Sequence, residues 1–128
     1  MSRTIYISGP MTGIKDFNRK EFFKAQARLT AQGFVVLNPA VNPMGLTYAQ
    51  YMQIDIAMLQ VCDSIYLLKG YSKSKGAGAE LALARSLGFK EYYEHEGHYI
   101  DASGDLLASV LVTDGEISDI VEVALAVN

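Results

Sequence analysis

The chain of 128 residues has little that would cross-link it or hold it in a membrane. It contains one cysteine, Cys62, which excludes a framework of disulfides within the chain. No apolar run approaches the roughly 18 residues that span a bilayer, and the first residues lack the apolar stretch of a signal peptide. We therefore expect a cytoplasmic protein of one domain over residues 1–128, with a core over about 3–93 and an extension over about 94–128.

Positive charge is missing from the end of the chain. Residues 1–90 hold all eleven Lys and Arg with five acids, whereas residues 91–128 hold nine acids and no Lys or Arg. The net charge is −3 and the basic residues are scattered, which argues against duplex nucleic acid as a partner. The basic part suits an anionic ligand such as a phosphate. The acidic part either contacts the basic part, in the same or a neighbouring chain, or forms a solvated surface.

Common ligand motifs are also missing. There is no G-x-x-x-x-G-K-[ST] P-loop, and no G-x-G-x-x-G follows the first apolar run, so the usual phosphate-loop and dinucleotide signatures are absent. His95 and His98 are too few for a zinc site. We expect neither a metal nor a cofactor, and Cys62 fits a small core residue better than a nucleophile.

Short apolar runs alternate with helical patterns over most of the chain. Asn18 with Glu21 resembles a capping box, and Thr47 is a second candidate cap. Strand–helix alternation predicts a parallel sheet with helices on both faces. Ligands of such sheets bind beyond the carboxyl ends of the strands, which directs attention to loops 9–17, 38–46 and 69–76. The expected strands are 4–8, 34–37, 64–68 and 89–93, and the expected helices are 18–32, 47–62 and 76–87.

The acidic extension is expected to be partly helical. Ser103 is a candidate cap for a short helix over 104–112, and Thr113 with Glu116 forms a second capping box. The apolar face that follows the second cap needs a surface to pack on, either the chain's own sheet or a second subunit. A homodimer or higher homo-oligomer is the default expectation, because two-fold dimers are the commonest assemblies. That face is made of Ile117, Ile120, Val121, Ala124 and Val127.

Two carboxylates stand out in apolar surroundings. Asp55 shares one helical face with Met52 and Leu59, where it is either a site acid or a buried structural residue that bonds loop amides. Glu80 lies near the start of a helix of small residues, after a loop rich in glycine and hydroxyls. It is either a nucleophile beside a phosphate-sized pocket or an ordinary helix-start glutamate.

Small and polar residues next to Glu80 suit an anionic ligand. Ser72 and Ser74, with their neighbouring lysines, either bind a phosphate or form a solvated loop. Gly76, Ala77 and Gly78 leave space for a ligand to approach the backbone. The hydroxyl of a strand tyrosine, Tyr6, can reach a site carboxylate or bond a polar partner in the core.

Five segments in this order resemble a known family: YISGPMTG, Asn18, NPA, the stretch from Asp55 to Asp63, and LLKGYSKSKGAGAE. Over about residues 3–90 the chain is similar to the nucleoside 2-deoxyribosyltransferase superfamily, in particular to its small DUF4406-type, often phage-encoded relatives. The nucleoside 5'-monophosphate N-glycosidases belong to the same superfamily. The resemblance implies a flavodoxin-like, Rossmann-type α/β fold and cleavage of the bond between a nucleobase and its sugar.

The resemblance also assigns roles. It implies that Glu80 attacks the anomeric carbon, that Asp55 contacts or protonates the leaving base, and that Tyr6 orients Glu80. Ser74 matches a phosphate-binding serine of the monophosphate branch, which favours a 5'-monophosphate substrate. Pro10 departs from that branch, which has a serine there. The full set of expected substrate-binding residues is Ser8, Gly9, Pro10, Met11, Thr12, Gly13, Asn18, Ser72, Ser74, Gly76, Ala77 and Gly78.

The resulting expectation is an N-glycosidase that hydrolyses a nucleoside 5'-monophosphate through a glutamate nucleophile. Three alternatives stay open: a nucleoside deoxyribosyltransferase, a glycohydrolase of NAD or another ADP-ribosyl compound, and a nucleotide-binding module without catalysis.

Overall fold

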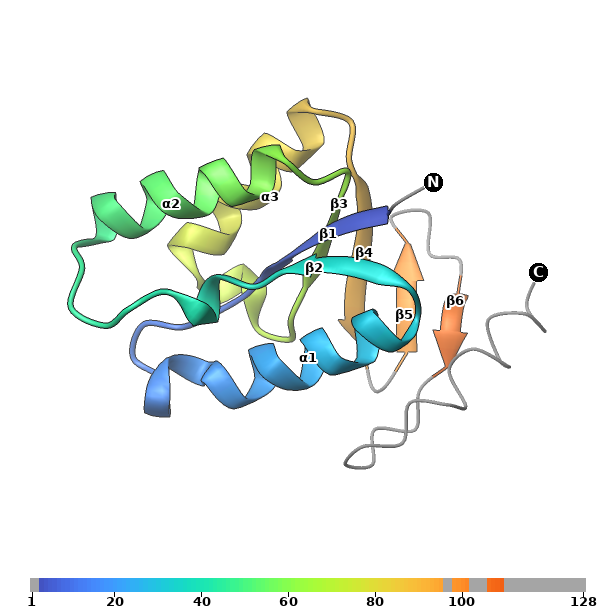
Figure 1. Ribbon diagram of the computed structural model, residues 1–128, viewed down its shortest axis with the longest axis horizontal. Helices are drawn as coiled ribbons and strands as arrows, with labels where there is room; N and C mark the ends of the chain where they lie inside the picture. Colours follow the sequence, from blue (N-terminus) through green and yellow to red (C-terminus); the bar gives the residue numbers. More distant parts are fainter. Residues whose placement is uncertain (1–2, 96–97, 102–105, 110–128) are drawn as a thin grey trace.

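The computed structural model describes residues 3–95, 98–101 and 106–109. Within these ranges a six-stranded sheet carries three helices, and the strand order is β2-β1-β3-β4-β5-β6 (Figure 1). The strands are β1 Arg3–Ser8, β2 Phe34–Leu37, β3 Ser64–Leu67, β4 Lys90–His95, β5 His98–Asp101 and β6 Leu106–Ser109. The helices are α1 Arg19–Ala31, α2 Tyr48–Gln60 and α3 Lys75–Ser86, with short 3-10 turns η1 Lys15–Asn18, η2 Pro39–Val41 and η3 Tyr71–Lys73.

The first four strands form the parallel sheet that the sequence predicts. β1 pairs in parallel with β2 and β3, and β3 pairs in parallel with β4. The order 2-1-3-4 is that of the flavodoxin-like fold. β2 is added on one side of β1, and β3 and β4 are added on the other side, so the order in which strands are added reverses between β1 and β3. This reversal leaves a crevice beyond the carboxyl ends of β1 and β3, because the connections that follow them leave toward opposite faces.

Two apolar clusters hold helices on opposite faces of this sheet. Ile5 and Ile7 of β1 pack with Phe22 and Leu29 of α1. The intervening Tyr6 points to the other face, where α2 and α3 supply the rest of the second cluster. Period-two alternation of a strand buried on both sides produces this division. That second cluster contains Leu59, Cys62, Ile65, Leu67, Leu81 and Ala84, so Cys62 is a core residue as expected.

The described part of the acidic extension differs from the expectation of a helix. The chain reverses after β4, and β5 and β6 extend the sheet in antiparallel pairing. The short helix expected over 104–112 is therefore wrong where it covers Leu106–Ser109, which form β6. Strand pairing along the edge of β5 overrides the local helical pattern of this short apolar run. The expected helix capped by Thr113 lies outside the described residues.

The capping box expected at the start of α1 is also wrong. Asn18 has a left-handed backbone with φ of 61°, and its side chain makes no capping hydrogen bond. Its Nδ2 instead donates to the carbonyl oxygen of Pro10 at 2.9 Å. Glu21 pairs with Lys24 one turn along the helix. Asn18, which the pattern predicts as a cap, thus holds the loop that follows β1 (residues 9–17, the first loop). The helix α1 begins after it.

Leu59 tests how much the α2 side of the core contributes to stability. It is fully buried, so Leu59→Ala should lower the free energy of unfolding by about 2–5 kcal/mol through lost contacts and a residual cavity. Val61 is 65% exposed and only two residues away, and Val61→Ala should change the same quantity by less than about 0.5 kcal/mol. Urea denaturation of both variants measures the difference. Equal losses would contradict this packing.

Candidate active site

Glu80 is a buried carboxylate held by the central strand. Its side chain reaches from α3 to β1, where the Tyr6 hydroxyl donates to Oε2 at 2.7 Å and the Ser8 hydroxyl donates to Oε1 at 2.6 Å. Residue Glu80 is only 5% exposed. Burial and the carboxylate keep the pKa of the Tyr6 phenol well above its usual value, so this hydroxyl stays a donor. Two donors from one strand fix the position of the carboxylate and favour its ionised form.

The way α3 begins determines where Glu80 is buried. Ser74 is the N-cap, and its hydroxyl oxygen accepts from the Ala77 amide at 3.1 Å. Gly76 faces α2 closely, since a Cβ there would lie 3.5 Å from Met52 Sδ and 3.9 Å from a Tyr48 ring carbon. These are ordinary van der Waals distances, so the first turn of α3 lies against α2, and Glu80 follows one turn later.

Asp55 faces the same space from α2. This helix begins with a complete capping box between Thr47 and Gln50, which confirms the second expected cap. Asp55 is 8% exposed, and its Oδ1 accepts from the side-chain amide of Asn42 at 3.1 Å. Within the described part of the chain, its other carboxyl oxygen, Oδ2, accepts no hydrogen bond. The sequence left two interpretations of Asp55, a site acid and a buried structural residue. The structure is compatible with both, because Asp55 bonds a loop side chain and also lines a cavity.

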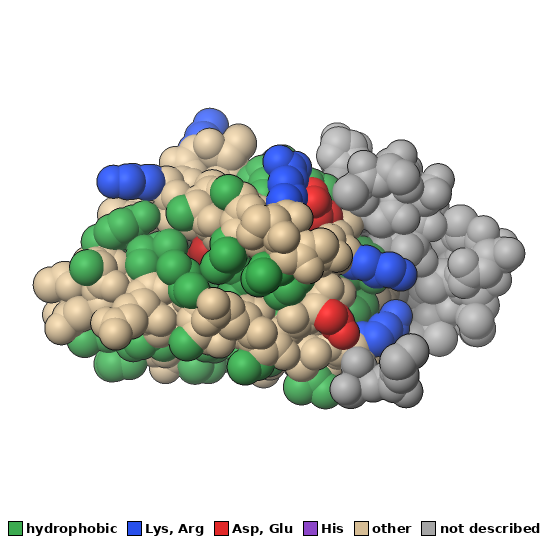
Figure 2. Space-filling view, turned by 90° about the horizontal axis from the view of Figure 1, so that it is seen from above, with side chains coloured by type: hydrophobic (Ala, Val, Ile, Leu, Met, Phe, Trp, Pro, Cys, Tyr) green, Lys and Arg blue, Asp and Glu red, His purple; other side chains and the backbone are tan. Residues whose placement is uncertain are grey.

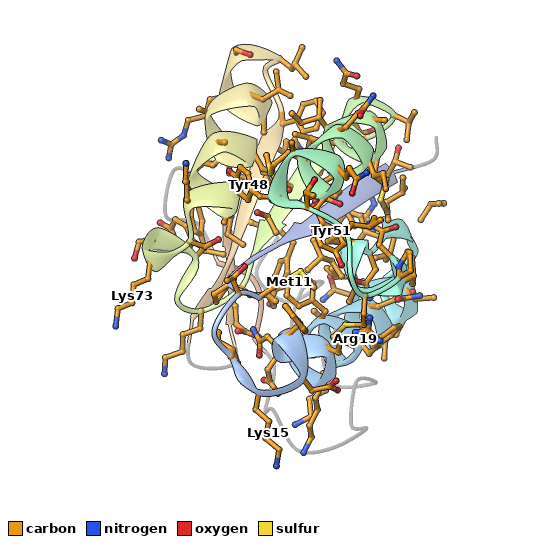
Figure 3. The ribbon with its side chains drawn as sticks, turned by 90° about the vertical axis from the view of Figure 1, so that its left-hand side faces the viewer. Met11, Lys15, Arg19, Tyr48, Tyr51 and Lys73 are labelled. Atoms are coloured by element: carbon orange, nitrogen blue, oxygen red, sulfur yellow. The ribbon has the colours of Figure 1, made fainter. Side chains whose placement is uncertain are left out.

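A cavity of about 410 Å³ joins the two carboxyl groups. It lies beyond the carboxyl end of β1, where the fold leaves its crevice, and Met11 of the first loop occupies the centre of this side of the molecule (Figure 3). Figure 2 shows the molecule from the side of α2 and α3, where hydrophobic side chains gather toward the left of the described surface, next to a small patch of an acidic side chain. The cavity volume is of the size that small-molecule sites have. Of the expected residues, it is lined by Tyr6, Gly9, Met11, Thr12, Asp55, Ser74, Gly76, Ala77 and Glu80.

Burial raises the pKa of both carboxyls. The pKa of Asp55 rises to about 6 because burial penalises its charged form. The pKa of Glu80 rises to about 7, with burial and the charge of Asp55 raising it and the two hydroxyl donors opposing the rise. The charge of Asp55 is the smallest of these effects on Glu80, and the shift of Asp55 comes from burial alone. Near neutral pH this pair holds and exchanges a proton, which is the property that acid–base chemistry requires.

A second hollow of about 470 Å³ lies on the other side of the first loop. Pro10, Asn18 and Thr12 line it, and Thr12 lines the first cavity as well. Ser8 lies behind the first cavity, in contact with Glu80. The remaining expected residues, Gly13, Ser72 and Gly78, are exposed and line neither space.

Gly9 has a steric reason for its place after β1. A Cβ at this position would lie 2.7 Å from Leu68 Cβ, closer than real Cβ atoms approach. The first loop therefore packs directly on the end of β3, and this packing brings Met11 to the cavity wall. Gly9→Ala would have to push the loop away from Leu68.

Sequence reasoning missed part of the cavity wall. Asn42 fell within the expected site loop 38–46, but nothing in the sequence singled it out. Arg19 and Tyr51 carried no motif at all, although an arginine in the first turn of a helix, where the dipole disfavours it, was a usable signal. Tyr51 holds the loop, since its hydroxyl donates to the Pro43 carbonyl at 2.7 Å and accepts from the Leu46 amide at 3.3 Å. The missed residues are Phe17, Arg19, Phe22, Pro39, Asn42, Met44, Gly45, Leu46, Tyr48, Tyr51 and Met52.

The described residues offer neither a metal centre nor a membrane span. Among them, no three His, Cys, Asp or Glu side chains gather in a way that would hold a metal ion. Over the same part of the chain, no helix has the length and apolar character to cross a bilayer.

Known proteins support the fold. A comparison with curated proteins finds no match. Among solved structures, the chain is similar to a 2-desoxiribosyltransferase from Leishmania mexicana, with a TM-score of 0.58 and 23% sequence identity. The alignment covers 71% of this chain and 63% of that chain, so the chain spans less than two thirds of that protein. This likeness confirms the expected deoxyribosyltransferase-like α/β fold.

The family follows from a separate match. Residues 3–93 match the family described as Domain of unknown function (DUF4406). This range contains the parallel strands up to Tyr93, both carboxyl groups and every residue that lines the cavity. Since the match extends over well more than half of the sequence, the chain belongs to the DUF4406 family.

Proposed function

We propose that the protein is an N-glycosidase that hydrolyses the bond between the base and the sugar of a nucleoside 5'-monophosphate. The observation that carries the proposal is the pair of buried carboxyls on one cavity, one of them held by two hydroxyl donors. A glycosidase needs two carboxyl groups in different environments, one as nucleophile and one as acid. Fold similarity to a 2-desoxiribosyltransferase supports a substrate of the nucleoside class.

Glu80 is proposed as the nucleophile. One carboxylate oxygen attacks the anomeric carbon C1' as the bond to the base breaks, and the electron pair of that bond leaves with the base nitrogen. Tyr6 and Ser8 hold the carboxylate, so little reorientation is needed before attack. The negative charge also stabilises the oxocarbenium-like sugar in the transition state.

Asp55 is proposed as the general acid. Its Oδ1 already accepts from Asn42, which leaves Oδ2 to carry the proton that passes to the departing base. The raised pKa lets Asp55 keep this proton at a pH where an exposed aspartate would have lost it. In the second half of the reaction the carboxylate of Asp55 takes a proton from water, whose oxygen attacks C1' and releases Glu80.

The N-terminus of α3 is proposed to bind the 5'-phosphate. Ser74 caps this helix and lines the cavity, and its hydroxyl hydrogen is still available because the oxygen serves as the capping acceptor. Helix amides and the dipole favour an anion there. Lys75 adds a positive charge beside the entrance, where its Nζ lies 5.2 Å from the centre of the Tyr48 ring. Thr12 also lines the cavity and is proposed to replace the serine that the first loop lacks at Pro10.

A nucleoside deoxyribosyltransferase is the second candidate, favoured by the fold similarity to the Leishmania mexicana protein. The first half of the reaction is the same in both. The two activities differ in whether water or a second base attacks the sugar bound to Glu80.

Release of free base tests the proposed activity. The protein is incubated with nucleosides, ribo- and deoxyribonucleoside 5'-monophosphates and NAD, and each base is followed by chromatography. We expect release from a monophosphate, and Glu80→Ala should lower it at least about 1000-fold because the covalent intermediate cannot form. Asp55→Asn should lower it about 100- to 10,000-fold for bases that need protonation. Asp63→Asn is the matched control, since this exposed aspartate lies outside the cavity.

Other outcomes separate the alternatives. Release only when a second base is added identifies a transferase, and release of nicotinamide from NAD identifies an ADP-ribosyl glycohydrolase. No release from any compound by folded protein, together with nucleotide binding that survives Glu80→Ala, identifies a binding module and contradicts the proposal.

Activity should depend on pH through the same two carboxyls. At low pH both are protonated and no nucleophile is present, whereas at high pH both are ionised and no acid is present. Only the form with one proton on the pair is active, so kcat/KM should be bell-shaped with its maximum between the two pKa values, about 6 and about 7. The position of the bell does not depend on which carboxyl loses its proton first.

Asp55→Asn provides the test of this assignment. The variant has no acid proton to lose, so the fall of kcat/KM above pH 7 should disappear. The rise at low pH should remain and should follow the pKa of Glu80 alone, which lies below about 7 because the charge of Asp55 no longer raises it. Asp63→Asn should keep the bell. A profile for Asp55→Asn with the same two limbs as the wild type would show that Asp55 is not the acid.

A further inference from the structure

Arg19 is a cationic side chain in the cavity that the proposed reaction does not use. Its Nη2 donates to the carbonyl oxygen of Asn42 at 3.1 Å. Its Nε is buried and has no hydrogen-bond partner in the described part of the chain. Arg19 also lines the same cavity as Asp55 and Glu80. The guanidinium is therefore held at one end by the carbonyl oxygen of Asn42, and the side chain forms part of the cavity wall.

The position of Arg19 is unfavourable unless a ligand uses it. The residue begins α1, where the helix dipole disfavours positive charge. It follows three residues with left-handed backbone, Asp16, Phe17 and Asn18, which cost conformational free energy. Within the described ranges, Arg19 forms no ion pair that would offset these costs. The charge of Arg19 in the cavity wall is therefore available to a ligand that accepts hydrogen bonds.

Arg19 lies at the Asp55 side of the cavity, away from the proposed phosphate end. It bonds the backbone of Asn42, and the side chain of Asn42 bonds Asp55. The phosphate end is marked by Tyr48, which is beside Gly76 and Lys75 at the start of α3. Figure 3 shows Tyr48 and Arg19 on opposite sides of Met11. A nucleotide with its phosphate at α3 and its glycosidic bond at Glu80 thus directs its base toward Asp55 and Arg19.

We propose that Arg19 selects the nucleobase by donating hydrogen bonds to a carbonyl oxygen of the base. The inference rests on the proposed function of this site. A guanidinium only donates, so it pairs with the oxo group of hypoxanthine, guanine or a pyrimidine. Adenine is the common base without a carbonyl oxygen, and its amino group would place donor against donor. A buried polar group left without its partner is the strongest means of rejecting an analogue.

The test compares inosine and adenosine 5'-monophosphates, which share sugar and phosphate. Hypoxanthine has a 6-oxo group and an N1–H where adenine has a 6-amino group and an unprotonated N1. Uridine 5'-monophosphate serves as the oxo substrate if the cavity takes pyrimidines. The wild type should turn over the better oxo nucleotide with kcat/KM at least about 10- to 100-fold above that of the adenine nucleotide. Arg19→Met, which cannot donate, should lose this advantage by lowering the oxo value and leaving the adenine value within about threefold. Lys20→Met removes the neighbouring exposed charge as a matched control and should change neither value.

A binding experiment tests the role of Arg19 independently of the proposed reaction. With Glu80→Gln as background, titration calorimetry measures the Kd of the same nucleotides with and without Arg19→Met, so the selectivity is tested even if no base is released. Arg19→Lys, which retains the charge, and the melting temperature of each variant report a merely structural role. Equal loss for all monophosphates with nucleosides unaffected would assign Arg19 to the phosphate. That result, equal loss for every compound, or an adenine nucleotide as the preferred ligand would overturn the proposal.

Discussion

The contact between Glu80 and the end of β1 is the constraint on which the site depends. One carboxylate on α3 accepts from two hydroxyls that stand two residues apart on the central strand. Tyr6 points to the α2–α3 face with the second apolar cluster, and Ser8 follows on the same face because side chains alternate along a strand. The register of β1 therefore determines both the core and the position of the carboxylate, and a shift by one residue would remove both.

Burying two carboxyl groups beside each other is unfavourable for folding, and the fold offsets it unequally. Glu80 receives two hydroxyl donors, whereas Asp55 receives one amide from a loop. Burial raises the pKa of both groups, to about 6 for Asp55 and about 7 for Glu80, and the two donors on Glu80 oppose the rise there. One proton between them relieves the repulsion that raises the pKa of Glu80. The unequal hydrogen bonding holds Glu80 in one position and leaves Oδ2 of Asp55 without a donor, which is the division that the proposed nucleophile and acid require.

The parallel sheet, its helices and the two carboxyls could be predicted from the sequence, because these depend on local patterns. Apolar runs such as 4–8 and 64–68 predicted buried strands, and Asp55 and Glu80 stood out as charges among apolar neighbours. The edge strand β6 could not be predicted, because it depends on pairing with β5. The left-handed turn at Asn18 could not be predicted either, because it depends on a contact with Pro10. Asn42 and Arg19 were missed for a similar reason, because each is placed at the cavity by a hydrogen bond to a residue distant in the sequence.

The first loop shows how a costly backbone can determine the shape of a site. Three consecutive left-handed residues would not persist in an isolated peptide. Here the Phe17 amide bonds the Ile14 carbonyl at 2.9 Å, and the Asn18 side chain bonds the Pro10 carbonyl at 2.9 Å, closing the loop on itself. Gly9 fixes the loop's other end against Leu68. The loop thus forms a fixed wall between the two hollows, with Thr12 reaching both and Arg19 at its end. A wall fixed before a ligand arrives cannot move to accommodate a different one, which is what the proposed selection by Arg19 requires.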